Sequence, residues 1–528
     1  MQLARLLGAL AAAPLVLAGA APAAAGTVPA APLTPSGPAP TLAAHTGKAF
    51  KAHPVPGVTL PPQNPRMAPN PKNNVHNDTW MTDNYSSLSG PLGRSPDVFS
   101  TTVQRVCVTL TFDRRGRLVA TCTDLAHGPG LYMFDATTLD QLAVMPLPYV
   151  PPPAGTNPAT NTTGGAYFYL DDHDRAVIAT SDRRIMVVAE TEDNGVPGFA
   201  TVATYDPTPC LPPDERMPSV LPDYQGRLWF VGRTHGTVGV FDPVAGRCSS
   251  TSLGQEIENS FAMAKDGAYI VTDTAQYKLR AGADLAPRVV WHVNYRNDGV
   301  QKPGQFNAGS GTTPTLVWSR RPNRRRQVPT YVAITDNADP LDVVVMRASD
   351  RLRHGQRRVV CQMPVFAKGA SSDENSLIAM GQSLVAENNY GYSLTDWNDQ
   401  LGDGTPIGGN LALVSIPGMA RVDVASDGSG CRKIWTNTSV RPPSAISKGD
   451  TANGLIYTYE NLRDRSGADP WYWTAVDYRT GKVAWRQRSG YGGLFNNHYA
   501  GIALGQAPRG RPTLYLGGVG GIMALRDR

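Results

Sequence analysis

The feature that most constrains the fold of this chain is a short unit of strands and turns that recurs along it. The unit is clearest between Ser260 and Val293, where strands are predicted at residues 261–264, 269–272, 276–279 and 288–293. Similar units begin near Val108, Tyr167, Val220, Thr315, Leu377, Ile446 and Ile502. About eight such units fill roughly 430 residues, which is near the period of propeller blades, about 40 to 50 residues.

The composition agrees with a fold made only of strands. The chain of 528 residues contains 53 Gly and 45 Pro, which favours many tight turns between short strands. Its hydrophobic content of 41% is enough for a large core. We therefore predict an all-β fold, a single β-propeller of about eight four-stranded blades formed by residues 72–528, with seven blades as the alternative.

Two segments precede the predicted propeller. Residues 1–25 have the pattern of a signal peptide, with a positive start at Arg5, an apolar run over residues 6–18 and small residues at Ala23-Ala24-Ala25. Residues 26–71 are rich in Ala and Pro and have almost no apolar periodicity, so we expect a disordered linker. The protein is therefore expected to be secreted or periplasmic, with no membrane span after removal of the signal.

Six cysteines, an even number in a chain expected to be exported, indicate disulfides. Cys107 and Cys122 lie on two predicted strands joined by a turn, so a bridge between neighbouring strands is expected. Pairing the others in sequence order joins Cys210 to Cys248 and Cys361 to Cys431, although six cysteines allow 15 connectivities. No pair has the spacing of metal ligands, and a structural role is expected for all six.

The net charge of +6 is mild for a chain of this length. The densest basic run, residues 320–326, lies between two predicted strands and indicates a solvated loop. A nucleic-acid site would need basic residues spread along a face together with aromatic residues for stacking. We therefore expect no nucleic-acid partner, and we expect a monomer.

One stretch resembles a known repeat. Residues 475–490, AVDYRTGKVAWRQRSG, and the later sequence LYLGGVGGIMALRD are similar to the repeat of the pyrroloquinoline-quinone (quinoprotein) propellers. The matching positions are Ala475-x-Asp477, the turn Thr480-Gly481-Lys482, and Trp485. The resemblance implies that the Asp and the turn Gly fix a hairpin while the Trp packs between adjacent blades. It concerns the fold, and a fold does not determine function.

Polar residues recur at two positions of the predicted blades. The loop that enters an innermost strand and the loop that leaves the second strand lie on the same face of a propeller, around the mouth of its channel. The entries include Glu258-Asn259-Ser260, Asp373-Glu374-Asn375-Ser376 and Asn496-Asn497-His498-Tyr499, and the exits include Asp336-Asn337 and Glu387-Asn388-Asn389. Turn capping is the alternative for each position, because Asn and Asp side chains bind nearby backbone groups.

This set of residues predicts a binding site at the channel mouth. The residues expected to contact a ligand are Asn259, Asn337, Asn375, Glu387, Asn388 and Asn497. Glu258, Glu374 and Asp336 supply carboxylate oxygens of the type that Ca²⁺ or Mg²⁺ binds. Acidic and Asn residues at a propeller axis, with residues 334–337 as the best local match, also resemble the metal sites of gluconolactonase and regucalcin-type lactone hydrolases. That resemblance implies a metal that polarises a lactone carbonyl and a base, here His498 or Asp336.

Three classes of function follow from the sequence. The favoured one is a propeller that binds a small molecule, a cation or an extracellular partner, because no motif specific to an enzyme is present. The second is a metal-assisted hydrolase or lactonase. The third is a quinone-dependent dehydrogenase, which is less favoured because the quinoprotein resemblance implies an adjacent Cys-Cys pair that the chain lacks.

Overall fold

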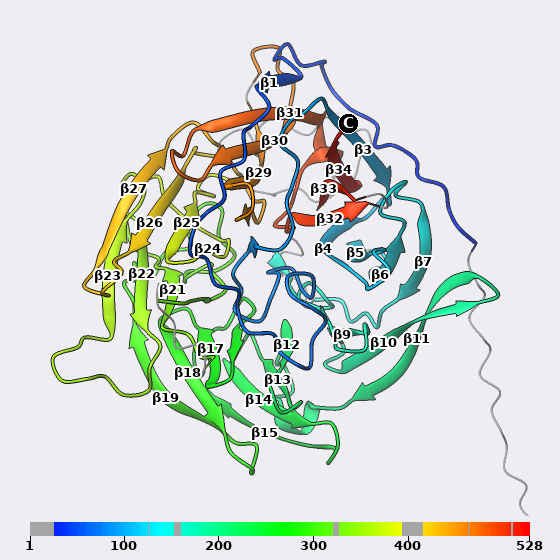
Figure 1. The fold of residues 1–528 in the computed structure, drawn as a ribbon. Coiled ribbons are helices and arrows are strands. Elements are labelled where there is room, and N and C mark those ends of the chain that lie inside the picture. Colours follow the sequence, from blue (N-terminus) through cyan, green and yellow to red (C-terminus); the bar gives the residue numbers. More distant parts are fainter. Residues whose placement is uncertain are drawn as a thin grey trace, which may run out of the picture.

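The computed structural model describes residues 26–124, 126–152, 160–319, 327–392, 415–462, 464–507 and 510–528. The predicted signal peptide, residues 1–25, and the basic run, residues 320–326, lie outside the described residues. Within the described part of the chain, four-stranded antiparallel blades surround a common axis (Figure 1). Regular helix is limited there to two short 3-10 turns, Thr208–Cys210 and Gly493–Phe495.

There are eight blades in the described structure, and in each one the strands run in order from the axis outward. Blade 1 contains β4 (Val106–Phe112), β5 (Leu118–Asp124), β6 (Gly128–Phe134) and β7 (Gln141–Pro146), and blade 2 contains β8 (Tyr169–Leu170), β9 (Ala176–Ala179), β10 (Ile185–Asp193) and β11 (Val196–Tyr205). Blade 3 contains β12 (Ser219–Pro222), β13 (Leu228–Val231), β14 (Thr237–Asp242) and β15 (Arg247–Ser252), and blade 4 contains β16 (Ala262–Ala264), β17 (Gly267–Val271), β18 (Ala275–Ala281) and β19 (Pro287–Asn294).

The remaining blades follow the same pattern, with one exception in blade 8. Blade 5 contains β20 (Thr315–Val317), β21 (Tyr331–Thr335), β22 (Asp342–Arg347) and β23 (Val359–Pro364), and blade 6 contains β24 (Ile378–Met380), β25 (Ser383–Glu387), β26 (Met419–Val424) and β27 (Cys431–Asn437). Blade 7 contains β28 (Lys448–Asp450), β29 (Leu455–Asn461), β30 (Pro470–Asp477) and β31 (Val483–Tyr491), and blade 8 contains β32 (Ala503–Ala507), β33 (Arg511–Gly517), β34 (Gly521–Asp527) and β3 (Pro96–Thr102).

Blade 8 closes the ring, because its outermost strand comes from the other end of the chain. Strand β3 pairs with β34 over seven residue pairs, from Pro96 opposite Asp527 to Thr102 opposite Gly521. This pairing covers the outer edge of β34, which would otherwise present unpaired backbone groups. The prediction of an all-β propeller with eight blades is confirmed, and every predicted blade start lies within two residues of an observed innermost strand.

The hairpin that resembles the quinoprotein repeat forms as expected. Asp477 ends β30, and its carboxylate accepts hydrogen bonds from the Arg479 N–H at 2.9 Å and the Thr480 hydroxyl at 2.9 Å. Gly481 has a φ of 69°, a backbone conformation that glycine adopts without steric cost. Trp485 is fully buried in a hydrophobic cluster that contains residues of blades 7 and 8. Local sequence therefore determines this turn, and the indole ring joins two blades.

The three predicted disulfides are confirmed. The bridges are Cys107–Cys122, Cys210–Cys248 and Cys361–Cys431. Cys107 and Cys122 lie opposite each other on β4 and β5, as the turn between these strands predicts. The described part of the chain contains no helix that is long and apolar enough to cross a membrane.

Residues 26–71, which we call the strap, are extended and lie against the blades. Strand β1 (His45–Gly47) of the strap pairs with β31, and Val28 exchanges backbone hydrogen bonds with Gln141. Leu33 is buried in the hydrophobic cluster of blades 7 and 8. The structure differs here from the expected disorder. The strap has no core of its own, as its composition predicts, and it gains its contacts from the propeller instead.

Residues 72–85, which we call the plug, fill the central channel. Carbonyl groups of the plug accept hydrogen bonds from the innermost strands of five blades, through the N–H groups of Leu170, Met263, Leu316, Ala379 and Gly449. The plug ends in β2 (Asn84–Tyr85), which pairs in parallel with β28. Figure 1 shows this blue segment crossing the middle of the ring. The inner edges of these five blades thus donate hydrogen bonds to the protein's own backbone.

Candidate functional site

Two amides that precede innermost strands join the blades at the channel mouth. Asn259 donates to the Gly311 carbonyl at 2.8 Å and accepts a hydrogen bond from the Tyr167 hydroxyl at 2.8 Å. Asn375 donates to the Glu387 carboxylate at 2.7 Å and to the Ala445 carbonyl at 2.9 Å. These contacts bring together the loops that enter blades 2, 4, 5, 6 and 7. Asn259 and Asn375 therefore hold the mouth in shape.

Two carboxyl groups, Glu258 and Glu374, are buried beside the mouth and influence each other's ionisation. Burial raises the pKa of Glu258 to about 8, while the nearby Arg233 guanidinium acts in the opposite direction. Burial and the negative charge of Glu258 raise the pKa of Glu374 well above its usual range. Oε2 of Glu258 and Oε1 of Glu374 have no hydrogen-bond partner among the described residues.

One cation lies close to this carboxyl pair. Arg233 is 3.0 Å from Glu258, donates to Glu256 at 2.9 Å, and donates to the Thr160 carbonyl at 2.7 Å. Its charge is shared with Glu256, Glu258 and Glu374, all of which raise the pKa of Arg233 against the effect of its burial. The group therefore has more carboxyls than cations.

The close approach of Glu374 to blade 5 requires a glycine. A Cβ on Gly311 would lie 2.5 Å from Oε2 of Glu374 and 2.3 Å from the Asp373 carbonyl oxygen. The same Oε2 accepts a hydrogen bond from the Phe306 N–H at 3.2 Å. Gly311 thus leaves the space in which the Glu374 carboxyl meets the backbone of the 306–311 loop.

Glu387 lies nearer the plug. Its Oε2 is bound by Asn375, and Asp83 of the plug and Lys448 of β28 both act on its ionisation. Burial raises the pKa of Glu387 to about 8 from an ordinary value of 4.5. Glu387 therefore belongs to the contact between blade 6 and the plug.

A pH dependence of stability follows from the raised pKa of Glu387. Between about pH 4.5 and pH 8 the folded protein holds a proton that the unfolded chain releases, so stability falls as pH rises through this window. Glu387→Gln keeps an acceptor for Asn375 but does not titrate. Urea unfolding at about pH 5 and pH 8 measures how much unfolding free energy each protein loses between these two pH values. We expect this loss to be smaller in Glu387→Gln than in wild type by about 1 kcal/mol or more. The partly exposed Asp97→Asn serves as the control, and an equal loss in Glu387→Gln and wild type would contradict the expectation.

The side chains of Asp336, Asn337 and Asn388 bond to other parts of the protein. Asp336 accepts hydrogen bonds from the N–H groups of Asp342 at 2.8 Å and Ala338 at 3.3 Å, and it pairs with Arg296. Asn337 donates to the Asn297 side chain, and Asn388 donates to the Ala370 carbonyl. Burial raises the pKa of Asp336 to about 6. The contacts of Asp336 match the turn-capping alternative, while Asn337 and Asn388 bind segments 40 and 18 residues away.

The predicted metal ligands do not come together as a set of three. Among the described residues, two groups of three possible ligands have their ligand atoms within 4.8 Å of one another: Asp171, Asp172 and His173, and Asp113, Asp174 and Glu190. Neither group includes Glu258, Glu374 or Asp336. The residues present therefore do not fit a Ca²⁺ or Mg²⁺ ion held by those three carboxylates, and we derive no step through a metal.

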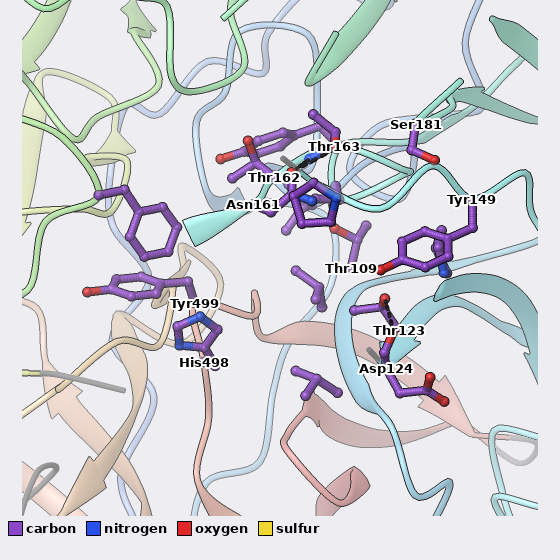
Figure 2. A pocket seen from close by; sticks show the side chains of 18 of the residues that line it. Thr109, Thr123, Asp124, Tyr149, Asn161, Thr162, Thr163, Ser181, His498 and Tyr499 are labelled. Carbon is purple, nitrogen blue, oxygen red and sulfur yellow. Dashed lines mark hydrogen bonds between the residues drawn. The ribbon is translucent and has the colours of Figure 1, made fainter. Parts of the chain in front are cut away.

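A pocket of about 100 Å³ opens at the mouth beside blades 1 and 2. It is lined by Val75, Val106, Val108, Thr109, Thr123, Asp124, Pro129, Tyr149, Pro152, Asn161, Thr162, Thr163, Ala166, Tyr167, Ser181, Phe306, Ile446, His498 and Tyr499. In Figure 2, His498 and Tyr499 lie on one side of the pocket, while Tyr149, Thr123 and Asp124 lie on the other. The wall combines apolar, aromatic and hydroxyl groups, a composition that suits organic ligands.

His498 is the predicted site residue that lines this pocket. Its Nδ1 lies 3.2 Å from the Tyr392 hydroxyl, and its ring contacts those of Phe306 and Tyr499. The preceding residue, Asn497, donates to the Gly517 carbonyl at 2.9 Å. Asn497 therefore anchors the loop that presents His498.

The sequence did not single out the aromatic residues of the pocket. Tyr167 and Tyr499 lie in loops that enter innermost strands, and this repeat position could have identified them as mouth residues. Phe306 comes from the long segment between β19 and β20, where no repeat position marks it. These residues connect the pocket to the buried carboxyls, because Tyr167 bonds to Asn259 and Phe306 bonds to Glu374.

No family model matches the chain, and no curated protein matches it in sequence. Among solved structures, a europium-containing methanol dehydrogenase is 11% identical, with 87% of this chain and 98% of that chain covered and a TM-score of 0.49. A putative 6-phosphogluconolactonase from Bacteroides uniformis is 12% identical, with 74% and 99% covered and a TM-score of 0.36. Sqt1 from Chaetomium thermophilum, bound to the N-terminus of ribosomal protein L10, is 9% identical, with 81% and 100% covered and a TM-score of 0.46.

These similarities concern the fold. They include a dehydrogenase and a putative lactonase, at TM-scores below 0.5 and a level of identity that carries no activity over to this chain. The class that the structure itself defines is an eight-bladed β-propeller with three disulfides and a plugged channel.

Proposed function

We propose that this protein is a ligand-binding propeller that holds a small organic molecule in the pocket at the channel mouth. The observation that carries the proposal is the pocket itself, where Tyr167, Phe306 and Tyr499 meet several hydroxyl side chains. Ligand pockets are typically concave and mostly apolar, with a few polar groups that orient the ligand. A cavity of about 150 Å³ can hold benzene, so the enclosed part of the ligand is about one small ring or less.

The proposed location of the protein is extracytoplasmic. Three disulfides are typical of proteins that fold outside the reducing cytosol, and the N-terminal pattern of residues 1–25 favours export. No contact among the described residues favours the metal-assisted hydrolase or the quinone-dependent dehydrogenase over ligand binding.

A variant that fills the pocket tests the proposal. Val108 is half-buried on β4 and lines the pocket, so Val108→Phe places a ring in the ligand's space. Each protein is incubated with a small-metabolite extract, desalted and examined by native mass spectrometry. We expect the wild-type protein to retain a ligand mass. Val108→Phe should retain at least about tenfold less of it, which corresponds to a loss of about 1.4 kcal/mol in binding free energy.

The matched control is Val290→Phe, at a half-buried valine on β19 that does not line the pocket. It should retain the ligand as wild type does. Equal retention by Val108→Phe and wild type, or no retained mass on wild type, would contradict the proposed function.

A further inference from the structure

The inner end of the mouth pocket has an aromatic wall. The rings of Phe306 and Tyr499 are perpendicular, with centroids 4.7 Å apart, and the ring of His498 lies 5.3 Å from that of Tyr499. Tyr167 belongs to the same lining. The faces of aromatic rings carry partial negative charge and attract cations within about 6 Å.

The buried carboxyls stand directly behind this wall. Phe306 binds Glu374 through its backbone N–H, and Thr162 of the lining donates to the Glu258 carbonyl at 3.5 Å. After burial, the charges of Glu258 and Glu374 are the next causes that raise the pKa of Tyr167. When these carboxyls are ionised, their charge therefore acts on the lining of the pocket.

The described residues of the lining include no Lys or Arg, and the one carboxylate among them, Asp124, is paired with Arg105 and His127 at the outer end. Arg233 lies behind the wall, where it bonds to Glu256 and to the Thr160 carbonyl. Arg233 interacts there with three carboxyls, Glu256, Glu258 and Glu374, and Arg216 interacts with Glu256 and Arg233. Oε2 of Glu258 and Oε1 of Glu374 also lack hydrogen-bond partners among the described residues, and no Lys or Arg is among the described lining residues in front of them.

We infer that the ligand carries a small cationic head, of the quaternary or protonated ammonium class, bound at the inner end of the pocket against Tyr167, Phe306 and Tyr499. This inference rests on the proposed function and deepens it. The rings contact the head. Burial keeps protons on Glu258 and Glu374 in the free protein, and a bound cation favours their ionised form, so the opposite charge arises by proton release on binding. The rest of the ligand extends toward Thr123, Tyr149 and Ser181, whose hydroxyls suit an uncharged polar tail.

A cation and its neutral isostere separate charge recognition from shape. Choline and 3,3-dimethyl-1-butanol have the same outline, but only choline is charged. By calorimetry on the purified chain at about pH 8, where an unperturbed imidazole is neutral, we expect choline to bind at least about tenfold more tightly than the alcohol. Glu374→Gln, which keeps an acceptor for the Phe306 N–H, should reduce this ratio to about threefold or less.

The control variant is Glu192→Gln, at an exposed acid of the β10–β11 hairpin that should leave the ratio unchanged. Equal binding of both probes by wild type would overturn the inference and leave the proposed function intact. The inference would also be overturned if neither probe bound. The proposed function is tested separately, by the ligand mass that wild type and Val108→Phe retain.

Discussion

Replacement of Asp83 by alanine is expected to lower the free energy of unfolding by about 3 to 5 kcal/mol, because it leaves a buried ammonium group without its carboxylate. Lys448 and Asp83 are both almost completely buried and form a direct ion pair. The Lys448 ammonium also donates a hydrogen bond to the Val75 carbonyl, and Asp83 binds the His76 ring at 3.1 Å. This pair fastens the plug to blade 7, so its loss affects the whole channel.

Urea unfolding measures this effect against two controls. Asp97→Ala removes a partly exposed carboxylate that pairs with Arg526 and Arg528, and it should cost about 0 to 1 kcal/mol. The double variant Asp83→Asn with Lys448→Met removes both charges and should recover most of the loss. A free energy within about 1 kcal/mol of wild type for Asp83→Ala would show that water or another group compensates Lys448.

Removal of β3 is expected to abolish cooperative folding of the propeller. Seven residue pairs join β3 to β34. This pairing closes the ring, because it joins a strand near the start of the propeller to a strand at its end within one blade. Without β3, the edge of β34 is open and blade 8 has only three strands. A propeller depends on contacts between every pair of neighbouring blades, so an open ring loses stability throughout.

Three truncated chains separate the contribution of β3 to folding from the contributions of the strap and the plug. A chain starting at Lys72 lacks the strap, one starting at Ser86 also lacks the plug, and one starting at Val103 lacks β3 as well. The two shorter chains carry Lys448→Met, so that no unpaired charge confuses the comparison. We expect a cooperative thermal transition by circular dichroism for the chains starting at Lys72 and Ser86, and none for the chain starting at Val103. A cooperative transition in the chain starting at Val103 would refute the role of β3.

The blades were predictable because their determinants are local. The Asp and Gly of the 477–481 turn bind and bend the backbone within a few residues, and the apolar strands around them follow the period of two. Asp113, Asp171 and Asp223 each bind the Arg four residues later in the first turn of blades 1, 2 and 3. Such local contacts recur with the sequence and define the first turn in these three blades. The disulfide pairs followed from the same order of strands.

The site was only partly predictable, because its contacts cross the ring. The two positions of the repeat located Glu258, Glu374 and His498 near the mouth, but the repeat treats Asp336 in the same way, and the structure holds Asp336 in a turn with Arg296 and Asp342. The pocket draws on the plug, on blades 1 and 2, and on the loops before blades 5, 7 and 8. No sequence period relates these segments.

The sequence by itself determined the propeller fold, the blade starts and the turns within the blades, and it favoured eight blades and the three cysteine pairs, because these features depend on neighbouring residues or on the order of strands. Only the tertiary structure decided that the strap lies against the ring, that the plug fills the channel, and that aromatic rings stand in front of Glu258 and Glu374. Residues 26–85 bind the open edges and surfaces of blades that are far away in the chain. Their sequence therefore has no periodic pattern from which these contacts could be predicted. Their positions exist only after the ring has closed.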